Sequence, residues 1–442
     1  MMPAQQYYAV FPSVGHCLSS SLLQILFYRS QTFLFDYSAV KVYYPSANRY
    51  IGFAREVYTF QMIGIYLSIG RYIPIGAKQQ SGRDNDLPTA RYLCRMKRKE
   101  MRILWVIATL LWAHSAVVAQ ETFRIVTFNA ENLCDTVHDE GFNDWEFLPQ
   151  GGKQWTEARY RRKLIAVAET ISEAGGTDWP WLVALCEVEN SCVTEALLAT
   201  TRLGEVGYAG TTSCGTDPRG MDVAFLYLKD RFRITASEEW QIPFTDADSA
   251  KRSRPVLYVR GQFYTGIPLD IMVVHLPSRR GGTRASAPAR RDAVRFIRGK
   301  CDSLLRSDPE RDLLIMGDFN ATPYDRDMRN HFVPLKADGS YPQDAPLVDI
   351  TTLLSAGSYP GSYYFGGQTQ QLDRFVVSRG MLARTASKGV KVQIGSVTNV
   401  KSHHMRRLTD GRAIPLRTYG GNNYLGGASD HLAVSALFRL PK

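Results

Sequence analysis

Several features that define common protein classes are missing from this sequence. No run of apolar residues reaches the length of about 20 that a helix needs to cross a bilayer. No Cys-x-x-Cys pair is present, which argues against a structural zinc site. The absence of low-complexity tracts and of repeats with a fixed period excludes solenoid architectures. Hydrophobic residues make up 45% and charged residues 21%, so the composition is that of a globular protein.

The net charge of +11 is concentrated near the N-terminus. Residues 1–95 carry 9 basic and 4 acidic side chains, and residues 96–119 carry 4 and 1. Residues 120–442 carry 40 basic and 37 acidic side chains, a difference of only 3. The charge of this large part therefore argues neither for nor against a nucleic-acid partner.

A secretory signal peptide is predicted in residues 96–119. The segment begins with the basic stretch "MKRKEMR", continues with an apolar run from Ile103 to Trp112, and ends in small residues at Ala119. A membrane anchor is the alternative, but the apolar run is too short for it. Cleavage near Ala119 would export the rest of the chain without stable membrane insertion, as a periplasmic or secreted protein.

The position of this signal suggests that residues 1–95 are a misassigned or unstructured extension, because signal peptides stand at the N-terminus. Translation would then begin at Met96 or Met101. After the signal, residues 120–442 contain five cysteines. Export permits disulfides, and an odd number leaves at least one thiol free or paired between chains.

Residues 120–442 are predicted to form one α/β domain. Apolar residues at helical spacing predict helices, and alternating or continuous apolar runs predict strands. Helices are expected in 156–175, 193–208 and 286–307, and strands in 123–133, 179–190, 220–230, 312–320, 371–378 and 429–440, with a hairpin in 254–278. Continuous runs indicate strands covered on both faces, so we expect two stacked sheets with helices outside.

Polar side chains recur at the ends of these apolar strands, where loops hold ligand-binding residues in α/β proteins. The set comprises carboxylates, amides and histidines, without a serine or cysteine in the context of a nucleophile: Asn129, Glu131, Glu187, His275, Asp318, Asn320, Asp373, Asp430 and His431. Hard oxygen ligands select Mg²⁺, Mn²⁺ or Ca²⁺. Such a set suits metal-assisted attack of water on a phosphate ester. In "GDFN", Asp318 and Asn320 stand two residues apart and would face one ligand together if the chain is extended.

The ordered motifs "TFNAENL", "LCEVEN", "VVHLPS", "MGDFNATP", "QLDRFVVS" and "SDHLAV" resemble the endonuclease/exonuclease/phosphatase superfamily, the deoxyribonuclease I-like proteins. The resemblance spans Phe123 to Leu440. It implies a four-layer α/β/β/α sandwich of two stacked mixed sheets with helices outside. It also implies a divalent cofactor, Mg²⁺ or Mn²⁺, with Ca²⁺ as a further option.

The resemblance implies a role for each motif residue. Asn129 and Glu187 would bind the metal, with Glu187 as the main ligand, and Asp430 would lie near a second metal position or orient its neighbours. Asp318 would activate the attacking water, Asn320 would hold it and the phosphate, and His275 would contact phosphate or act as an acid. His431 would contact the scissile phosphate, with Asp373 fixing its tautomer. Glu131 stands where the family often has an acidic residue, and Glu189 is a rival to Glu187.

Three arginines before strands are further candidates for contacting substrate phosphate: Arg219 first, then Arg252 and Arg254. His403 and His404 are expected to be ordinary loop residues. The favoured substrate is nucleic acid, because export suits scavenging and the basic, aromatic segment 402–427 can contact a polyanion or stack bases. An inositol-phosphate or phospholipid phosphohydrolase is the alternative, and "GSYYFGG" (361–367) is the candidate for the exposed apolar hairpin that a lipid substrate would need. An inactive binding module is the alternative of another class. Nothing indicates a protein partner.

Overall fold

The computed structural model describes four short strands near the N-terminus and, after them, residues 121–245, 254–279, 281–382 and 389–441. The short strands form two antiparallel pairs, β1 (Lys41–Tyr44) with β2 (Arg49–Gly52) and β3 (Tyr58–Met62) with β4 (Ile65–Ile69). The chain divides into two compact units, Met1–Ala119 and Gln120–Lys442. The predicted signal segment 96–119 and Arg252 lie outside the described residues.

One mixed sheet of the second unit is built around the first long strand. β5 pairs in parallel with β6 and antiparallel with β24, so the first and last long strands of this unit are neighbours. The strands in spatial order are β18 (Lys391–Val392), β24 (Val434–Arg439), β5 (Thr122–Leu133), β6 (Leu182–Val188), β8 (Asp222–Leu228) and β7 (Tyr208–Thr212), with β19 (Thr398–Asn399) also paired to β24.

The other mixed sheet contains the predicted hairpin, β10 with β11. β11 pairs in parallel with β12, and β12 pairs antiparallel with β17. The strands in order are β13 (Val333–Pro334), β14 (Leu347–Asp349), β17 (Asp373–Ser378), β12 (Leu313–Asp318), β11 (Pro268–His275), β10 (Val256–Phe263) and β9 (Phe232–Trp240). Among the strands of five residues or more in the two sheets, the predictions missed β7 and β9, and they also missed the shorter strands β13, β14, β18 and β19.

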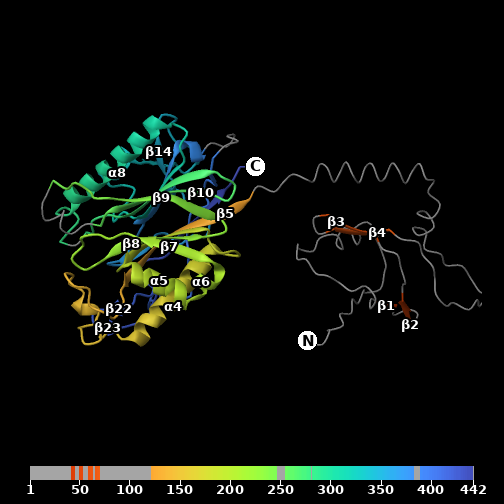
Figure 1. Ribbon diagram of the computed structural model, residues 1–442, viewed down its shortest axis with the longest axis horizontal. Helices are drawn as coiled ribbons and strands as arrows, with labels where there is room; N and C mark the ends of the chain where they lie inside the picture. Colours follow the sequence, from red (N-terminus) through yellow and green to blue (C-terminus); the bar gives the residue numbers. More distant parts are fainter. Residues whose placement is uncertain are drawn as a thin grey trace, which may run out of the picture. The chain divides into compact units, whose positions relative to one another are not determined.

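The two sheets stack face to face with helices on both outer sides (Figure 1), which confirms the predicted four-layer sandwich. One outer layer holds α4 (Glu157–Gly175), α5 (Ser191–Thr200) and α6 (Arg202–Val206), and the other holds α8 (Ala287–Ser307) and α9 (Arg326–His331). The helix predicted over 193–208 is interrupted at Thr201, whose backbone is extended and whose hydroxyl accepts a hydrogen bond from the Leu203 amide at the start of α6. None of the described helices combines the length and apolar character that a bilayer crossing requires.

Strand β12 shows how the layers are held together. Leu314 and Met316 belong to the core between the sheets, whereas Leu313 and Ile315 pack in the cluster that includes Ile297 of α8. Successive strand residues point to opposite faces, so a continuous apolar run covers both. The five cysteines of the described residues are free: Cys134, Cys186, Cys192, Cys214 and Cys301.

Short hairpins at the ends of the strands complete the domain. They are β15 (Tyr363–Phe365) with β16 (Gln368–Gln370), β20 (Met405–Arg407) with β21 (Ala413–Pro415), and β22 (Tyr419–Gly420) with β23 (Asn423–Tyr424). Three short 3-10 turns lie at Trp145–Phe147, Ile350–Thr352 and Arg379–Leu382. Tyr363 forms an isolated bridge with His431, which brings the first hairpin to the start of the last long strand.

Candidate active site

Three polar residues stand level with one another across neighbouring strands. His275 is in register with Asp318 on the parallel pair β11 and β12, and Asp318 is in register with Asp373 on the antiparallel pair β12 and β17. The carboxyl ends of β11 and β12 therefore meet the amino end of β17. All three side chains are buried, with at most 3% of each residue exposed.

Strand bulges place the acidic residues of the other sheet. The register of β5 with β6 shifts between Asn129 and Leu133, and β6 shifts against β8 between Cys186 and Val188. Glu131 and Glu187 sit inside these bulges, and both have a positive φ, 48° and 60°. A bulge removes a residue from the ladder and redirects its side chain, which is how each carboxylate leaves the strand pattern.

The "GDFN" segment brings Asp318 and Asn320 together through a turn, not through an extended chain. Asn320 has a φ of 46°, and its amide donates to Oδ1 of Asp318 over 2.8 Å. Its side-chain nitrogen lies 3.2 Å from Oδ2 of Asp318. Gly317 is required before them, because a Cβ there would lie 1.9 Å from the carbonyl oxygen of Val274. The predicted extended geometry is therefore wrong, and that the two side chains face one ligand stays a prediction.

Asp318 is the centre of the cluster. Its Oδ2 accepts a hydrogen bond from Nδ2 of Asn129 over 3.1 Å and lies 3.7 Å from Nε2 of His275 and 4.0 Å from Nε2 of His431. Burial, and after it the charge of Asp373, raises the pKa of Asp318 to about 6. The carboxylate is therefore a stronger base than a solvated aspartate.

His431 is held by Asp373. Its Nδ1 lies 2.7 Å from Oδ2 of Asp373, so Nε2 is the nitrogen that faces Asp318. Burial by itself lowers the pKa of His431, but the adjacent Asp373 carboxylate outweighs it and raises the pKa well above the ordinary value. The geometry predicted for Asp373 is thus present. The ring of Tyr363 packs on the imidazole with 4.6 Å between ring centroids.

His275 differs from His431 in its affinity for a proton. Its Nε2 lies 3.8 Å from Oε1 of Glu187, and its buried Nδ1 has no hydrogen-bond partner among the described residues. Burial, followed by the nearby charges of Arg254 and Arg219, lowers the pKa of His275 well below the ordinary value. His275 therefore holds a proton less tightly than a solvated imidazole, and His431 holds one more tightly.

The oxygen-rich side of the cluster suits a divalent cation. Burial tends to raise the pKa of Glu187, but the charges of Arg219 and Arg254 outweigh it and keep the carboxylate ionised. Its Oε2 accepts the Asn132 amide over 2.9 Å, while Oε1 faces His275. The carboxylate oxygens of half-buried Glu187 and buried Asp318, which lie on either side of His275, fit Mg²⁺ or Mn²⁺ better than a soft metal.

Glu189 does not compete with Glu187 for this place. Its Oε2 accepts a hydrogen bond from the Asp135 amide over 2.7 Å, outside the cluster. Burial raises the pKa of Glu189 to about 8, with Asp135 and other acidic neighbours adding to the effect. The bulge at Glu187 breaks the alternation that would have placed both glutamates on one face.

Asp430 and Glu131 are joined through an arginine that the sequence analysis did not single out. Arg417 forms an ion pair with Asp430, and its Nε lies 3.5 Å from Oε1 of Glu131. Glu131 also accepts the Thr418 amide over 2.7 Å. Burial, and after it the charge of Asp430, raises the pKa of Glu131 to about 7. Glu131 therefore helps to hold Arg417, which in turn holds Asp430.

Lys163 of α4 was also missed. Its buried ammonium donates to the carbonyl oxygens of Glu131 over 3.0 Å and Ala428 over 2.6 Å, and to the hydroxyl of Thr418. A lysine at an apolar position of the helix is a sequence signal that could have revealed it, because lysine is rarely buried without partners. Through these hydrogen bonds Lys163 connects the bulge of β5 to the segment that precedes Asp430.

Two of the three arginines predicted to contact substrate, Arg219 and Arg254, form ion pairs with the same carboxylate. Asp217 lies 3.3 Å from Nε of Arg219 and 2.7 Å from Nη2 of Arg254. Arg254 is 3% exposed, whereas the side chain of Arg219 is 31% exposed. Arg219 is therefore open to solvent beside Glu187, and Arg254 supports it from inside.

Comparison with solved structures finds similar folds at low identity. A humanized zebrafish (D. rerio) TDP2 carrying 14 mutations is 18% identical, covering 72% of this chain and 98% of that chain, with a TM-score of 0.44. The human Nocturnin catalytic domain with bound sulfate is 18% identical, covering 73% and 97%, with a TM-score of 0.42. An endonuclease/exonuclease/phosphatase family protein from Bacteroides thetaiotaomicron is 14% identical, covering 73% and 98%, with a TM-score of 0.45.

These likenesses carry no argument about substrate. A search of curated proteins gives no match. The family model described as Endonuclease/Exonuclease/phosphatase family matches residues 124–439, which include every residue of the cluster. The chain belongs to the endonuclease/exonuclease/phosphatase family, whose members are phosphoester hydrolases.

Proposed function

We propose that the protein is a metal-dependent nuclease or related phosphodiesterase that acts outside the cytoplasm. The observation that carries the catalytic part is the meeting of residues from both sheets. Glu187 of β6 and His431 just before β24 face His275 of β11 and Asp318 of β12, with successive contacts of 3.8, 3.7 and 4.0 Å. A carboxylate of raised basicity can activate water, and the two histidines can donate protons or hydrogen bonds to the phosphate, which are steps that favour phosphoester hydrolysis.

In this proposal Asp318 orients and deprotonates the attacking water. The backbone N–H of Asn320 and the side-chain Nδ2 of Asn129 donate hydrogen bonds that keep this carboxylate in place. His431 presents Nε2–H to a phosphoryl oxygen, because Asp373 occupies Nδ1. His275 offers its imidazole on the other side of Asp318.

Glu187 would hold the divalent cation, with Asn129 and Asp430 as further oxygen donors. When bound, such an ion neutralises phosphate charge and polarises the phosphoryl oxygens. Asp430 is ion-paired with Arg417, whose side chain is 39% exposed, so this arginine can shift between the carboxylate and a substrate phosphate.

Aromatic side chains beside the cluster support nucleic acid as the substrate. Tyr363 packs on His431, and Phe365 stacks on Tyr363 with an interplanar angle of 9°. Phe365 is 63% exposed, and Tyr324, which closely follows "GDFN", is 81% exposed. Exposed rings next to a phosphate site can stack on bases. By contrast, Tyr419 of the basic segment is buried against Trp155 and cannot serve this purpose.

The proposal is tested by hydrolysis assays with the purified protein in Mg²⁺, Mn²⁺ or EDTA. The substrates are plasmid DNA, RNA, bis-p-nitrophenyl phosphate, inositol phosphates and sphingomyelin. The His431→Ala variant removes the phosphate contact, and His331→Ala, on α9 outside the cluster, is the matched control. We expect metal-dependent cleavage of nucleic acid that the first variant loses and the second keeps.

Other results would change the conclusion in different ways. Cleavage of inositol phosphate or phospholipid alone would retain the catalytic cluster and refute the choice of substrate. No cleavage of any substrate with either metal would favour an inactive binding module. Export rests on the pattern of residues 96–119, and a native mature chain that begins before Ala119 would contradict it.

A further inference from the structure

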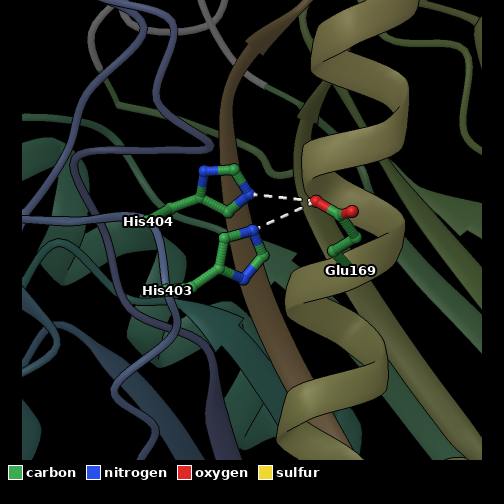
Figure 2. A group of neighbouring side chains, drawn as sticks. All are labelled: Glu169, His403 and His404. Carbon is green, nitrogen blue, oxygen red and sulfur yellow. Dashed lines mark hydrogen bonds and ion pairs between the residues drawn. The ribbon is translucent and has the colours of Figure 1, made fainter.

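A second cluster of metal-ligating side chains lies outside the catalytic cluster. His403 and His404, in the segment between β19 and β20, both direct a ring nitrogen at one carboxylate oxygen of Glu169 on α4 (Figure 2). The distances to Oε2 of Glu169 are 3.2 Å from Nε2 of His403 and 3.3 Å from Nε2 of His404. The expectation that these histidines are ordinary loop residues overlooked this convergence.

We propose that Glu169, His403 and His404 bind a zinc ion that fastens this segment to α4. The three ligand atoms lie within 4.8 Å of one another. With metal–ligand distances of about 2.0–2.2 Å, ligands at the corners of a tetrahedron are about 3.3–3.6 Å apart. The observed separations of 3.2 and 3.3 Å thus need little rearrangement to receive the ion.

The orientation of the two rings supports metal binding. Adjacent residues of an extended chain point in opposite directions, yet these rings lie with centroids 3.9 Å apart and face the same carboxylate. Nitrogen ligands with one carboxylate select zinc over magnesium, which prefers oxygen alone. Three protein ligands leave a fourth position for water.

Glu173, one turn after Glu169 on α4, supplies the support that histidine ligands commonly have. Its Oε1 bonds Nδ1 of His403, and its Oε2 accepts the His403 amide over 3.1 Å. A carboxylate at Nδ1 places the proton there and directs the Nε2 lone pair at the ion. Glu173 is thus a positioning residue for His403.

The proposed ion would act on the catalytic domain through the segment that follows. The carbonyl oxygen of His404 accepts the Leu416 amide over 3.0 Å, and Leu416 directly precedes Arg417, the partner of Asp430. Helix α4 also carries Lys163, which bonds the Glu131 carbonyl. Zinc would therefore fix the base of the segment that supports Asp430, without taking part in hydrolysis.

An ion pair without metal is the competing explanation. In this alternative a protonated His403 pairs with Glu169 and Glu173, and His404 donates Nε2–H to Oε2 of Glu169 over 3.3 Å. The two explanations differ at the Nε2 atoms, which carry protons in the ion pair and present lone pairs to a bound cation.

Zinc titration calorimetry on the full chain distinguishes the two explanations. Excess Mg²⁺ is present throughout, and the stoichiometry and Kd of Zn²⁺ binding are compared between the native chain and the His403→Ala/His404→Ala variant. Glu169→Gln removes the third ligand on an exposed helix face, Glu173→Gln removes the support, and His331→Ala is the control. Circular dichroism verifies that each variant is folded.

We expect the double histidine variant and Glu169→Gln to bind one Zn²⁺ fewer per chain, and Glu173→Gln to bind about tenfold or more weakly. His331→Ala should match the native chain. An unchanged stoichiometry and Kd in the folded double variant, or no Zn²⁺ binding by the native chain, would overturn the proposal. The readout is metal binding, so failure here is distinguishable from absence of hydrolysis.

Discussion

Replacing Asp373 with asparagine tests the charge relationship at the centre of the site. The substitution keeps the size of the side chain but removes the carboxylate that bonds Nδ1 of His431 over 2.7 Å in a fully buried position. A hydrogen bond to a charged group contributes about 1.5–3 kcal/mol. With tenfold in rate for each 1.36 kcal/mol, kcat should fall about 10- to 150-fold.

The pH dependence should change with it. Asp373 is the main cause that raises the pKa of His431 against burial, so Asp373→Asn lowers that pKa. The imidazole then loses its proton at lower pH, and the alkaline limb of the kcat profile should move to lower pH. Initial rates on the best substrate across a pH series measure both effects.

Asp312→Asn is the matched control for this experiment. Asp312 is also a buried carboxyl with a raised pKa, about 6 because of burial, but it precedes β12 at the end of the strand opposite Asp318. Its variant should keep native kcat. An Asp373→Asn enzyme within fivefold of native kcat and with an unshifted profile would refute the reasoning.

Three further predictions concern backbone, burial and pH. Gly317→Ala should lower the free energy of unfolding by about 3 kcal/mol or more, because its Cβ would lie 1.9 Å from the carbonyl oxygen of Val274. Gly299→Ala, whose Cβ would lie in open space on α8, should raise the free energy of unfolding by about 0.5–1 kcal/mol. Urea unfolding measures both changes. The pKa of Glu189 is about 8 in the folded protein, against an ordinary value of 4.5. Between these pH values the folded state binds more protons than the unfolded state. This group therefore lowers the free energy of unfolding by about 1.4 kcal/mol for each pH unit of increase. Glu189→Gln should remove that slope, and parallel urea curves for variant and native across this range would contradict it. Asp318 with a pKa of about 6 predicts that kcat/KM falls as pH drops below about 6, and a flat profile from 5 to 8 would exclude it as the base.

The strands and the positions of the site residues along them were predictable because burial leaves a pattern in the sequence. The run Leu313–Met316 predicts a strand covered on both faces, and the polar residues that follow mark its end. The hairpin of β10 and β11 followed from two apolar runs and a short polar turn. The resemblance carried by the ordered motifs then implied that Asp318, Asp373 and His431 lie close together.

Features that depend on a single residue leaving a regular pattern were not predictable. The bulge at Glu187 separates it from Glu189, and no periodicity distinguishes the two. Arg417 and Lys163 act through partners more than 200 residues away in sequence, such as Glu131 and Ala428. The break between α5 and α6 depends on one capping threonine in an otherwise helical stretch.

The neighbouring positions of β5 and β24 have a consequence for biosynthesis. Asn129 leaves the ribosome about 300 residues before His431, and the strand that carries Asn129 lacks one of its two neighbours until β24 emerges. A nascent chain that has produced Glu187, His275 and Asp318 still lacks His431, to which the proposed function assigns the contact with the phosphate. If that assignment holds, the domain becomes able to hydrolyse its substrate only when the last long strand has been synthesised and has paired with β5.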